Sequence, residues 1–319
     1  MKEPIKRRSF LEKSALAGLG TALSFPVFSA QPQKVPGGNE SLRIHIFSKH
    51  LQFLNYREMA DAAAEIGFDG VDLAVRPKGH VLPEKVGEDL PLAVAALKQA
   101  GFQPEMMTTA VRRADEVYTK KVLETAAKLG IKYYRLGYYK YPDDQSIPET
   151  ISKIRKQLKE LSHLNKSLEI KGAYQNHAGL RVGANIWEIW EMLKDVDNGY
   201  LGCQYDIRHA TVEGGRSWQT GLKLIRPKIN TLVLKDFRWE KANGKWELLN
   251  TPIGEGMVDF TAYFKLLKKY QLNVPVSMHC EYDLGGAEHG RQKISVSPKT
   301  VFQAMKKDLN RVRELWSNA

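Results

Sequence analysis

Short apolar runs alternate with longer amphipathic stretches along most of this chain. Eight of the short runs have the length and residue types of strands, and we predict strands at 43–48, 70–74, 103–109, 132–137, 170–175, 201–206, 230–235 and 274–279. The stretches between them place apolar residues at helical spacing, and several end on a glycine just before the next strand. This alternation predicts an α/β protein built from eight βα units.

The number of units decides between two α/β architectures. An open doubly wound sheet can also hold alternating units, but no Gly-x-Gly-x-x-Gly turn follows the first predicted strand. Eight units in roughly 275 residues are typical of a closed (β/α)8 barrel. We therefore predict a single TIM barrel domain over residues 42–319.

The first 41 residues do not follow this pattern. Arg7 and Arg8 precede a mildly apolar run, rich in glycine and alanine, that ends in small residues near Ala30, which resembles a twin-arginine export signal. An uncleaved membrane anchor is the alternative, but the run is interrupted by glycines and a proline and is short for the ~20 apolar residues that a span needs. We predict a signal peptide over 1–30, a linker over 31–41 and a periplasmic protein.

Charge and cysteine content narrow the class of partner. The 319 residues carry a formal charge of +12, but the lysines and arginines are scattered among acids in the helical stretches, which favours a solvated surface over a nucleic-acid interface. The two cysteines, Cys203 and Cys280, fall on predicted strands separated by a third, ~10 Å apart and beyond disulfide reach. We predict two buried thiols, no nucleic-acid partner and no membrane partner after signal removal, and the sequence leaves a homo-oligomer open.

Polar side chains gather at the predicted carboxyl ends of the strands, the end of such barrels where active sites lie. They are Ser48, Lys49, His50, Asp72, Arg76, Thr108, Thr109, Arg135, Tyr138, Gln175, Asn176, His177, Asp206, Arg208, His209, Lys235, Asp236, His279 and Glu281. Side chains two residues apart on a strand share a face. On this basis, four of them are predicted to converge from the fifth to the eighth strand: Gln175, Asp206, Lys235 and Glu281.

Four motifs on these units resemble those of the sugar phosphate isomerase/epimerase superfamily, the xylose isomerase-like TIM barrels: GFDGVDLAVRPKGHVLPE, YDIRHATVEGG, LKDFRW and HCEYDLGGAEHG. The resemblance covers residues 42–319. It implies one divalent metal (Mn, Mg or Zn), which many members hold with a Glu of the fifth strand, an Asp of the sixth, a His of the seventh and a Glu of the eighth. It also implies a pair of acids that act as acid and base on the substrate.

Carried over to this chain, the resemblance assigns the sixth-strand Asp to Asp206 and the eighth-strand Glu to Glu281. The fifth-strand Glu is replaced by Gln175, a neutral and weak ligand, and the seventh-strand His falls at or near Val233, which cannot ligate. The candidate metal ligands are therefore Gln175, Asp206 and Glu281. Because two of the usual four are lost, the ammonium of Lys235 is a second candidate for the cation that stabilises an enediolate. A salt bridge from Lys235 to either carboxylate is the structural alternative.

The resemblance implies a sugar isomerase or epimerase that abstracts a proton next to a carbonyl. The predicted catalytic groups are Glu281, Lys235 and His279, and the predicted substrate-binding groups are His50, Arg135, His177, His209 and Trp239, with Trp218 and Trp239 on rim loops. A lyase or hydratase acting on a keto-sugar or keto-glycoside is the first alternative. A catalytically inactive sugar-binding barrel is the second, motivated by the missing Glu and His. A multi-zinc endonuclease is disfavoured, because only part of the eight histidines lie at the rim.

Overall fold

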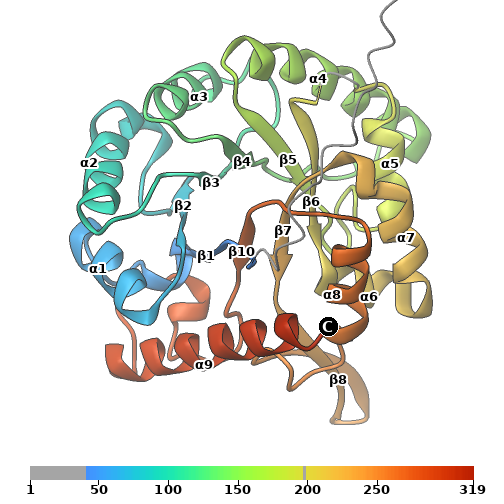
Figure 1. Ribbon diagram of the computed structural model, residues 1–319. Coiled ribbons are helices and arrows are strands. Elements are labelled where there is room, and N and C mark those ends of the chain that lie inside the picture. The colour runs from blue at the N-terminus through green and yellow to red at the C-terminus, as the bar shows by residue number, and fades with distance from the viewer. Residues whose placement is uncertain (1–40, 197–198) are drawn as a thin grey trace, which may run out of the picture. The chain divides into compact units, whose positions relative to one another are not determined.

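The structure is a computed structural model that describes residues 41–196 and 199–319 (Figure 1). The predicted signal peptide, 1–30, and residues 31–40 of the predicted linker lie outside the described residues. The described residues form one compact unit. Within the described part of the chain, no helix combines the length and the apolar character required to cross a membrane.

Eight parallel strands close into a barrel in the order β1-β10-β7-β6-β5-β4-β3-β2. Each overlaps one of the predicted strands, so the predicted barrel is confirmed. The strands are β1 (Ile44–Phe47), β2 (Gly70–Val75), β3 (Met106–Thr109), β4 (Tyr133–Arg135), β5 (Lys171–Gln175), β6 (Leu201–Asp206), β7 (Ile229–Leu234) and β10 (Val276–Met278).

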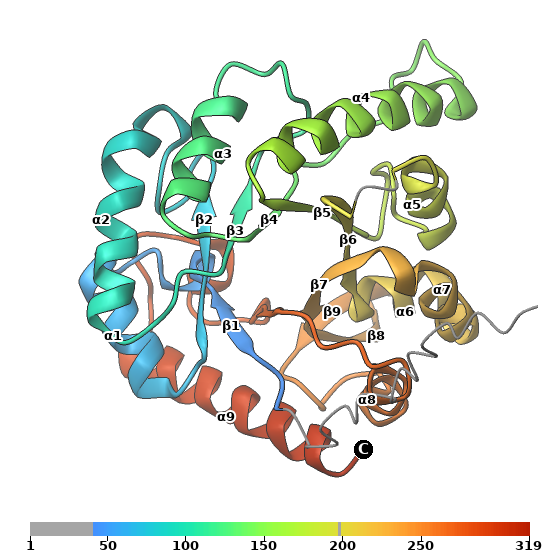
Figure 2. The ribbon, with the colours of Figure 1, turned by 45° about the horizontal axis from the view of Figure 1, so that its top comes forward.

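The helices form a ring outside these strands (Figures 1 and 2). The α-helices are α1 (Tyr56–Ile66), α2 (Val86–Gln99), α3 (Thr119–Lys128), α4 (Ile147–Ser167), α5 (Ile186–Leu193), α6 (Ile207–Gly214), α7 (Trp218–Ile225), α8 (Phe260–Lys269) and α9 (Pro298–Ser317). Short 3-10 turns are η1 (Ser48–Leu51), η2 (Pro83–Lys85), η3 (Gly215–Ser217), η4 (Arg226–Lys228) and η5 (Ala287–His289). Asn55 and Ser146 begin α1 and α4 with capping boxes. The resulting rigid frame brings the strand ends together.

A β-hairpin that the sequence did not predict follows β7. Its strands, β8 (Asp236–Ala242) and β9 (Lys245–Thr251), pair antiparallel and project beyond the helical ring (Figure 1). The Asp236 carboxylate anchors its base by accepting hydrogen bonds from four backbone N–H groups, two of them from Gly254 and Gly256. A Cβ on Gly256 would lie 2.3 Å from Asp236 Oδ1, so only glycine fits there. The hairpin places Trp239 on β8 instead of the predicted rim loop.

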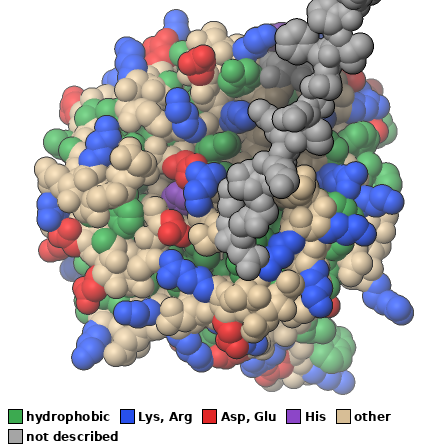
Figure 3. Space-filling model, in the orientation of Figure 1, with side chains coloured by type: hydrophobic (Ala, Val, Ile, Leu, Met, Phe, Trp, Pro, Cys, Tyr) green, Lys and Arg blue, Asp and Glu red, His purple; other side chains and the backbone are tan. Residues whose placement is uncertain are grey.

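One tryptophan and both cysteines are buried in the structure. Trp218 was expected on a rim loop but is the first residue of α7, is buried, and lies edge-on to Tyr263 with ring centroids 6.1 Å apart. Cys203 and Cys280 are both buried and free, as predicted. On the face shown in Figure 3, basic and acidic side chains are interspersed.

Candidate active site

A cavity of about 190 Å³ lies at the carboxyl ends of the barrel strands, and we call it the inner chamber. Its lining comes from six of the eight βα units, which a closed barrel brings to one place. The lining residues are Phe47, Lys49, Arg76, Arg135, Tyr138, Gln175, His177, Arg181, Lys235, His279 and Glu281. The chamber is therefore polar and rich in positive charge.

The four side chains predicted to converge do meet, and they form a continuous chain of contacts. Gln175 donates from Nε2 to Asp206 Oδ2 over 2.7 Å. The Lys235 ammonium lies 3.2 Å from Asp206 Oδ2 and 3.1 Å from Glu281 Oε2. Lys235 thus bridges the two carboxylates at the base of the chamber.

The two carboxylates that Lys235 bridges have different surroundings. The Asp206 side chain is fully buried and does not line the chamber, whereas that of Glu281 is 23% exposed and does. Asp206 also accepts from the backbone N–H of His209, which makes it the N-cap of α6. Asp206 is therefore the buried counter-ion that positions Lys235, and Glu281 is the carboxylate that can reach a substrate.

Charge sets the protonation states of these groups. Burial disfavours the charged form of Lys235, but Asp206 and Glu281 outweigh it and raise the pKa of this ammonium. Burial also disfavours ionised Glu281, but Lys235 and Lys49 together hold the pKa of Glu281 well below its ordinary range. Burial raises the pKa of Asp206, and the neighbouring Lys235 opposes that effect. The base of the chamber therefore holds an ammonium beside the Glu281 carboxylate.

Lys49, which follows β1, completes the surroundings of Glu281. Its ammonium lies 2.9 Å from Glu281 Oε1, so each carboxylate oxygen of Glu281 contacts a different lysine. Burial lowers the pKa of Lys49, and Glu281 opposes this shift. Among the described residues that line the inner chamber, Glu281 is the sole carboxylate.

A buried relay orients His279. Ser277 donates from its hydroxyl to Asp72 Oδ2 over 2.6 Å, so the serine oxygen is left to accept from His279 Nε2 at 3.1 Å. This arrangement puts the proton on Nε2 and leaves Nδ1, 3.6 Å from Glu281 Oε1, as an acceptor. Burial lowers the pKa of His279 to about 3, so the ring is neutral. His279 can accept a hydrogen bond from a substrate hydroxyl.

The rings of two further histidines lie next to each other at a tilt of 34°. The rings of His177 and His209 lie 4.1 Å apart between centroids. Arg208, which can only donate, contacts His209 Nδ1 at 3.0 Å, so the proton of His209 is on Nε2. Burial lowers the pKa of His177 to about 4 and that of His209 well below its ordinary value. His177 lines the chamber, and His209 supports it from behind.

The amide of Gln175 is oriented away from a ligand role. Arg135, which can only donate, contacts Gln175 Oε1 at 3.1 Å, and the Tyr138 hydroxyl contacts the same oxygen. Gln175 therefore turns its amide nitrogen toward Asp206. Its oxygen, the atom that could bind a metal, is occupied.

A divalent metal held by Gln175, Asp206 and Glu281 does not fit this arrangement. The space between the two carboxylates is filled by the Lys235 ammonium, which contacts both. Across residues 41–196 and 199–319, no group of three or more His, Cys, Asp or Glu side chains is arranged to hold a metal ion. Of the two cations predicted for this position, a metal ion and an ammonium, the position between the carboxylates is filled by the ammonium of Lys235.

Of the five predicted substrate-binding residues, two line the inner chamber and three do not. Arg135 and His177 line the inner chamber. His50 is fully buried and accepts from the backbone N–H of Cys280 at 3.2 Å, which is a structural contact. His209 lies behind His177, and Trp239 is on the hairpin, so neither lines the chamber. The substrate-binding roles of all five residues, His50, Arg135, His177, His209 and Trp239, stay predictions.

Four polar residues of the lining were not assigned a role from the sequence: Lys49, Arg76, Tyr138 and Arg181. The first three belong to the polar residues at the predicted strand ends, and this position is the feature of the sequence that could have identified them. Arg181 lies in the loop between β5 and α5, and its guanidinium stacks on the Tyr138 ring at 4.3 Å. Arg181 is in a loop, where side-chain direction does not alternate as it does along a strand. The strand pattern therefore could not predict that it reaches the chamber.

Comparison with known proteins agrees with the fold. Residues 60–298 match the sequence model of the "Xylose isomerase-like TIM barrel" family. The comparison with curated proteins gave no match.

Three solved structures illustrate the similarity. The apo form of the 3-keto-D-glucoside 4-epimerase YcjR from E. coli is 14% identical, covers 86% of this chain and 100% of its own, and superposes with a TM-score of 0.64. D-psicose 3-epimerase from Clostridium cellulolyticum H10, solved with D-tagatose, is 12% identical over 86% and 99% of the two chains, with a TM-score of 0.64. A xylose isomerase-like TIM barrel protein from Mycobacterium smegmatis, in complex with magnesium, is 11% identical over 87% and 99%, with a TM-score of 0.61. At these identities the structures establish the fold alone.

Proposed function

Because this chain belongs to the xylose isomerase-like TIM barrel family, we propose that it is a sugar isomerase or epimerase that abstracts a proton next to the carbonyl of a keto-sugar. The observation that carries this proposal is the pairing of Lys235 and Glu281, an ammonium and a carboxylate 3.1 Å apart at the base of a chamber. Similarity to two solved sugar epimerases supports it.

In this reaction Glu281 is the base. In the free protein Lys235 and Lys49 keep the Glu281 carboxylate weakly basic. A substrate carbonyl oxygen that accepts a hydrogen bond from Lys235 draws that ammonium away from Glu281. The carboxylate becomes more basic as the adjacent carbon becomes more acidic, so proton transfer is favoured only when substrate is in place.

Lys235 stabilises the product of that transfer. Removal of a proton next to a carbonyl places negative charge on the carbonyl oxygen. A fixed cation at that oxygen stabilises this charge and so lowers the activation free energy for forming the enediolate. The other described side chains that line the chamber also favour negative charge there, because they include the cations Lys49, Arg76, Arg135 and Arg181 and no second carboxylate. His279 and His177, both neutral, accept hydrogen bonds from sugar hydroxyls.

A second candidate function, elimination from a keto-sugar or keto-glycoside, is favoured by one observation. Epimerisation through two faces of a carbon needs a proton-transfer group on each side. The fifth-strand position carries Gln175, whose amide cannot carry the proton. Elimination needs a base at only one face, with a donor for the leaving group. The Tyr138 hydroxyl, which lines the chamber, is the nearest such donor to Gln175.

Incubation with keto-sugars in deuterated water tests the proposal. We would follow D-fructose, D-tagatose and a methyl 3-keto-glucoside by proton NMR. Solvent deuterium in a recovered stereoisomer supports epimerisation, and release of methanol from the glycoside supports elimination. If none of the three exchanges a proton or changes, the proposed chemistry is wrong for this substrate class.

A further inference from the structure

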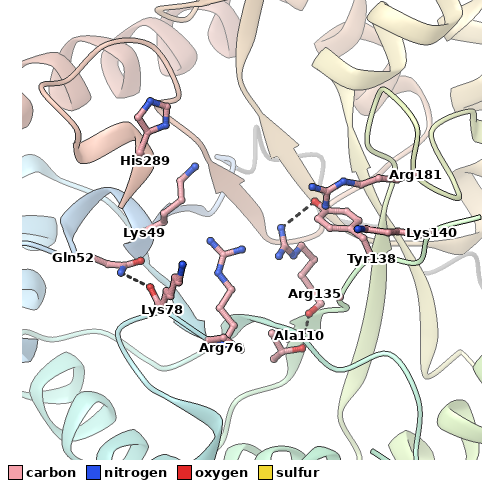
Figure 4. A pocket seen from close by; sticks show the side chains of 13 residues that line it. Lys49, Gln52, Arg76, Lys78, Ala110, Arg135, Tyr138, Lys140, Arg181 and His289 are labelled. Carbon is pink, nitrogen blue, oxygen red and sulfur yellow. Dashed lines mark hydrogen bonds between the residues drawn. The ribbon is translucent and has the colours of Figure 1, made fainter. Parts of the chain in front are cut away.

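A second cavity, of about 500 Å³, opens outside the inner chamber, and we call it the outer cavity. The two share five lining residues, so they form one continuous cleft: Lys49, Arg76, Arg135, Tyr138 and Arg181. Figure 4 shows side chains from both sides of the barrel mouth pointing into the outer cavity. A molecule bound at Lys235 and Glu281 can therefore extend into it.

The lining of the outer cavity is rich in positive charge, and of its cations only Lys49 forms an ion pair with a described carboxylate, that of Glu281. Its six cations are Lys49, Arg76, Lys78, Arg135, Lys140 and Arg181, and His289 lies beside them. None of the thirteen described residues that line it is an aspartate or a glutamate. Elsewhere on the described surface, arginines pair with acids, as Arg57 does with Asp61 and Arg155 with Glu191. The lining of the outer cavity therefore departs from the pattern of the surface.

Its arginines have hydrogen-bonding capacity to spare. The Arg76 guanidinium lies over the Phe47 ring at 5.2 Å and forms no ion pair with a described carboxylate. Arg181 contacts the Tyr138 ring in the same way. Arg135 is only 5% exposed, yet its Nε has no hydrogen-bond partner among the described residues. A buried guanidinium N–H without a partner is costly unless a ligand satisfies it.

Mutual repulsion adds to this cost. Burial and the neighbouring Arg135 lower the pKa of Arg76 to about 10. Figure 4 shows the guanidinium groups of Arg76 and Arg135 both directed into the open space. An anion placed there would relieve the repulsion and accept the free N–H groups, since guanidinium forks match carboxylate and phosphate oxygens.

We propose that the outer cavity is an anion subsite, and that the substrate carries a carboxylate or phosphate group on the part of the molecule remote from its reacting carbons. Arg76, Arg135 and Arg181 bind the anionic group, and the exposed Lys78 and Lys140 attract it toward them. The anion subsite rests on the outer cavity alone, whereas the statement that its ligand is a substrate rests on the proposed function.

Calorimetric binding of matched sugars tests the subsite without turnover. The probes are D-glucose 6-phosphate, D-glucuronate, D-glucose and inorganic phosphate. We expect the phosphate or the carboxylate sugar to bind about tenfold or more tightly than D-glucose, and the preference to fall as salt is added. A preference for only one charged sugar identifies whether the group is a phosphate or a carboxylate, and competition by inorganic phosphate would support the subsite further.

Variants locate the binding. Arg76→Gln and Arg181→Gln are each expected to reduce the preference about tenfold. The paired change Lys78→Gln with Lys140→Gln, both outside the inner chamber, is expected to weaken its salt dependence. Arg226→Gln is the matched control, because the Arg226 guanidinium stacks on Tyr270 at 4.6 Å but lies outside both cavities. Unchanged thermal unfolding of each variant would show that it is folded.

Two results would overturn the subsite: equal affinity for all three sugars, or an Arg226→Gln variant that loses as much preference as Arg76→Gln. The proposed function fails separately. Turnover of neutral keto-sugars without any preference for charged ones would remove the anion subsite and leave the proposed reaction. Tight binding of the charged sugars, with no proton exchange in any keto-sugar, would do the reverse.

Discussion

Replacing Lys235 with methionine removes a cation that contacts both Asp206 and Glu281. Methionine keeps most of the length of the side chain, so the change leaves little empty volume. The Asp206 side chain is fully buried and keeps only its hydrogen bonds from Gln175 and the backbone of His209. The variant therefore isolates the cost of a buried carboxylate without its counter-ion.

The loss of stability expected for this variant follows from the distances of the Lys235 ammonium to the Asp206 and Glu281 carboxylates. At an effective dielectric constant of about 20, an ammonium about 3 Å from each of two carboxylates gains roughly 5 kcal/mol from each. Desolvation of three charges opposes much of that gain. Loss of one partner from a buried ion pair costs about 3–5 kcal/mol, because the other charge stays buried. We expect Lys235→Met to lower the free energy of unfolding by that amount.

Urea unfolding at pH 7 measures the loss, and two further variants sharpen it. In Lys235→Met with Asp206→Asn, no buried charge is left unpaired, and we expect most of the stability to return. Lys307→Met is the matched control, because Lys307 pairs with Glu255 on the exposed surface, and there we expect no measurable change in the urea midpoint.

The pH dependence has a definite sign. Without Lys235, the folded-state pKa of Asp206 rises further above its unfolded value, so the folded variant binds a proton more readily than the unfolded chain. Its stability deficit should shrink as the pH falls toward the unfolded pKa, about 4, and grow as the pH rises. A single variant that loses less than about 1 kcal/mol, or a double variant that recovers nothing, would refute the assignment of Asp206 as a buried counter-ion.

Two more predictions concern a second buried carboxylate and metals. Burial raises the pKa of Asp308 in α9 to about 6, so the folded state loses stability as the pH rises from about 4 to 6. Asp308→Asn should therefore be more stable than the wild type at pH 7 by roughly 2–3 kcal/mol in urea unfolding, with no difference below pH 4. Mn²⁺, Mg²⁺ and Zn²⁺ should leave the Tm of the wild type unchanged, since Lys235 occupies the space between the carboxylates. Stoichiometric metal in the purified protein would contradict this.

The barrel was predictable because its signal repeats. Each strand is a short run that is buried on both faces, each helix has an apolar stripe, and eight repetitions of that pair leave few other architectures. The convergence of Gln175, Asp206, Lys235 and Glu281 was predictable for the same reason, since alternation along a strand sets which side chains point inward.

What the sequence could not supply depends on contacts between segments far apart in the chain. The hairpin is polar and its strands lack a buried face, so its pattern resembles a loop. The orientation of the Gln175 amide is decided by Arg135 and Asp206, which lie 40 and 31 residues away. The burial of His50 against Cys280 and the position of Arg181 over Tyr138 likewise follow from tertiary packing, which no periodicity reports.

The most direct test of the proposed chemistry is solvent deuterium exchange at the carbon next to the carbonyl, compared between the wild type and Glu281→Gln. A keto-sugar that the wild type exchanges would be used, with calorimetry to show that the variant still binds it. We expect Glu281→Gln to bind the sugar within a few-fold of the wild type and to exchange the proton at least ~100-fold more slowly, because the amide cannot accept the proton. Exchange at an undiminished rate in a folded Glu281→Gln protein would contradict it.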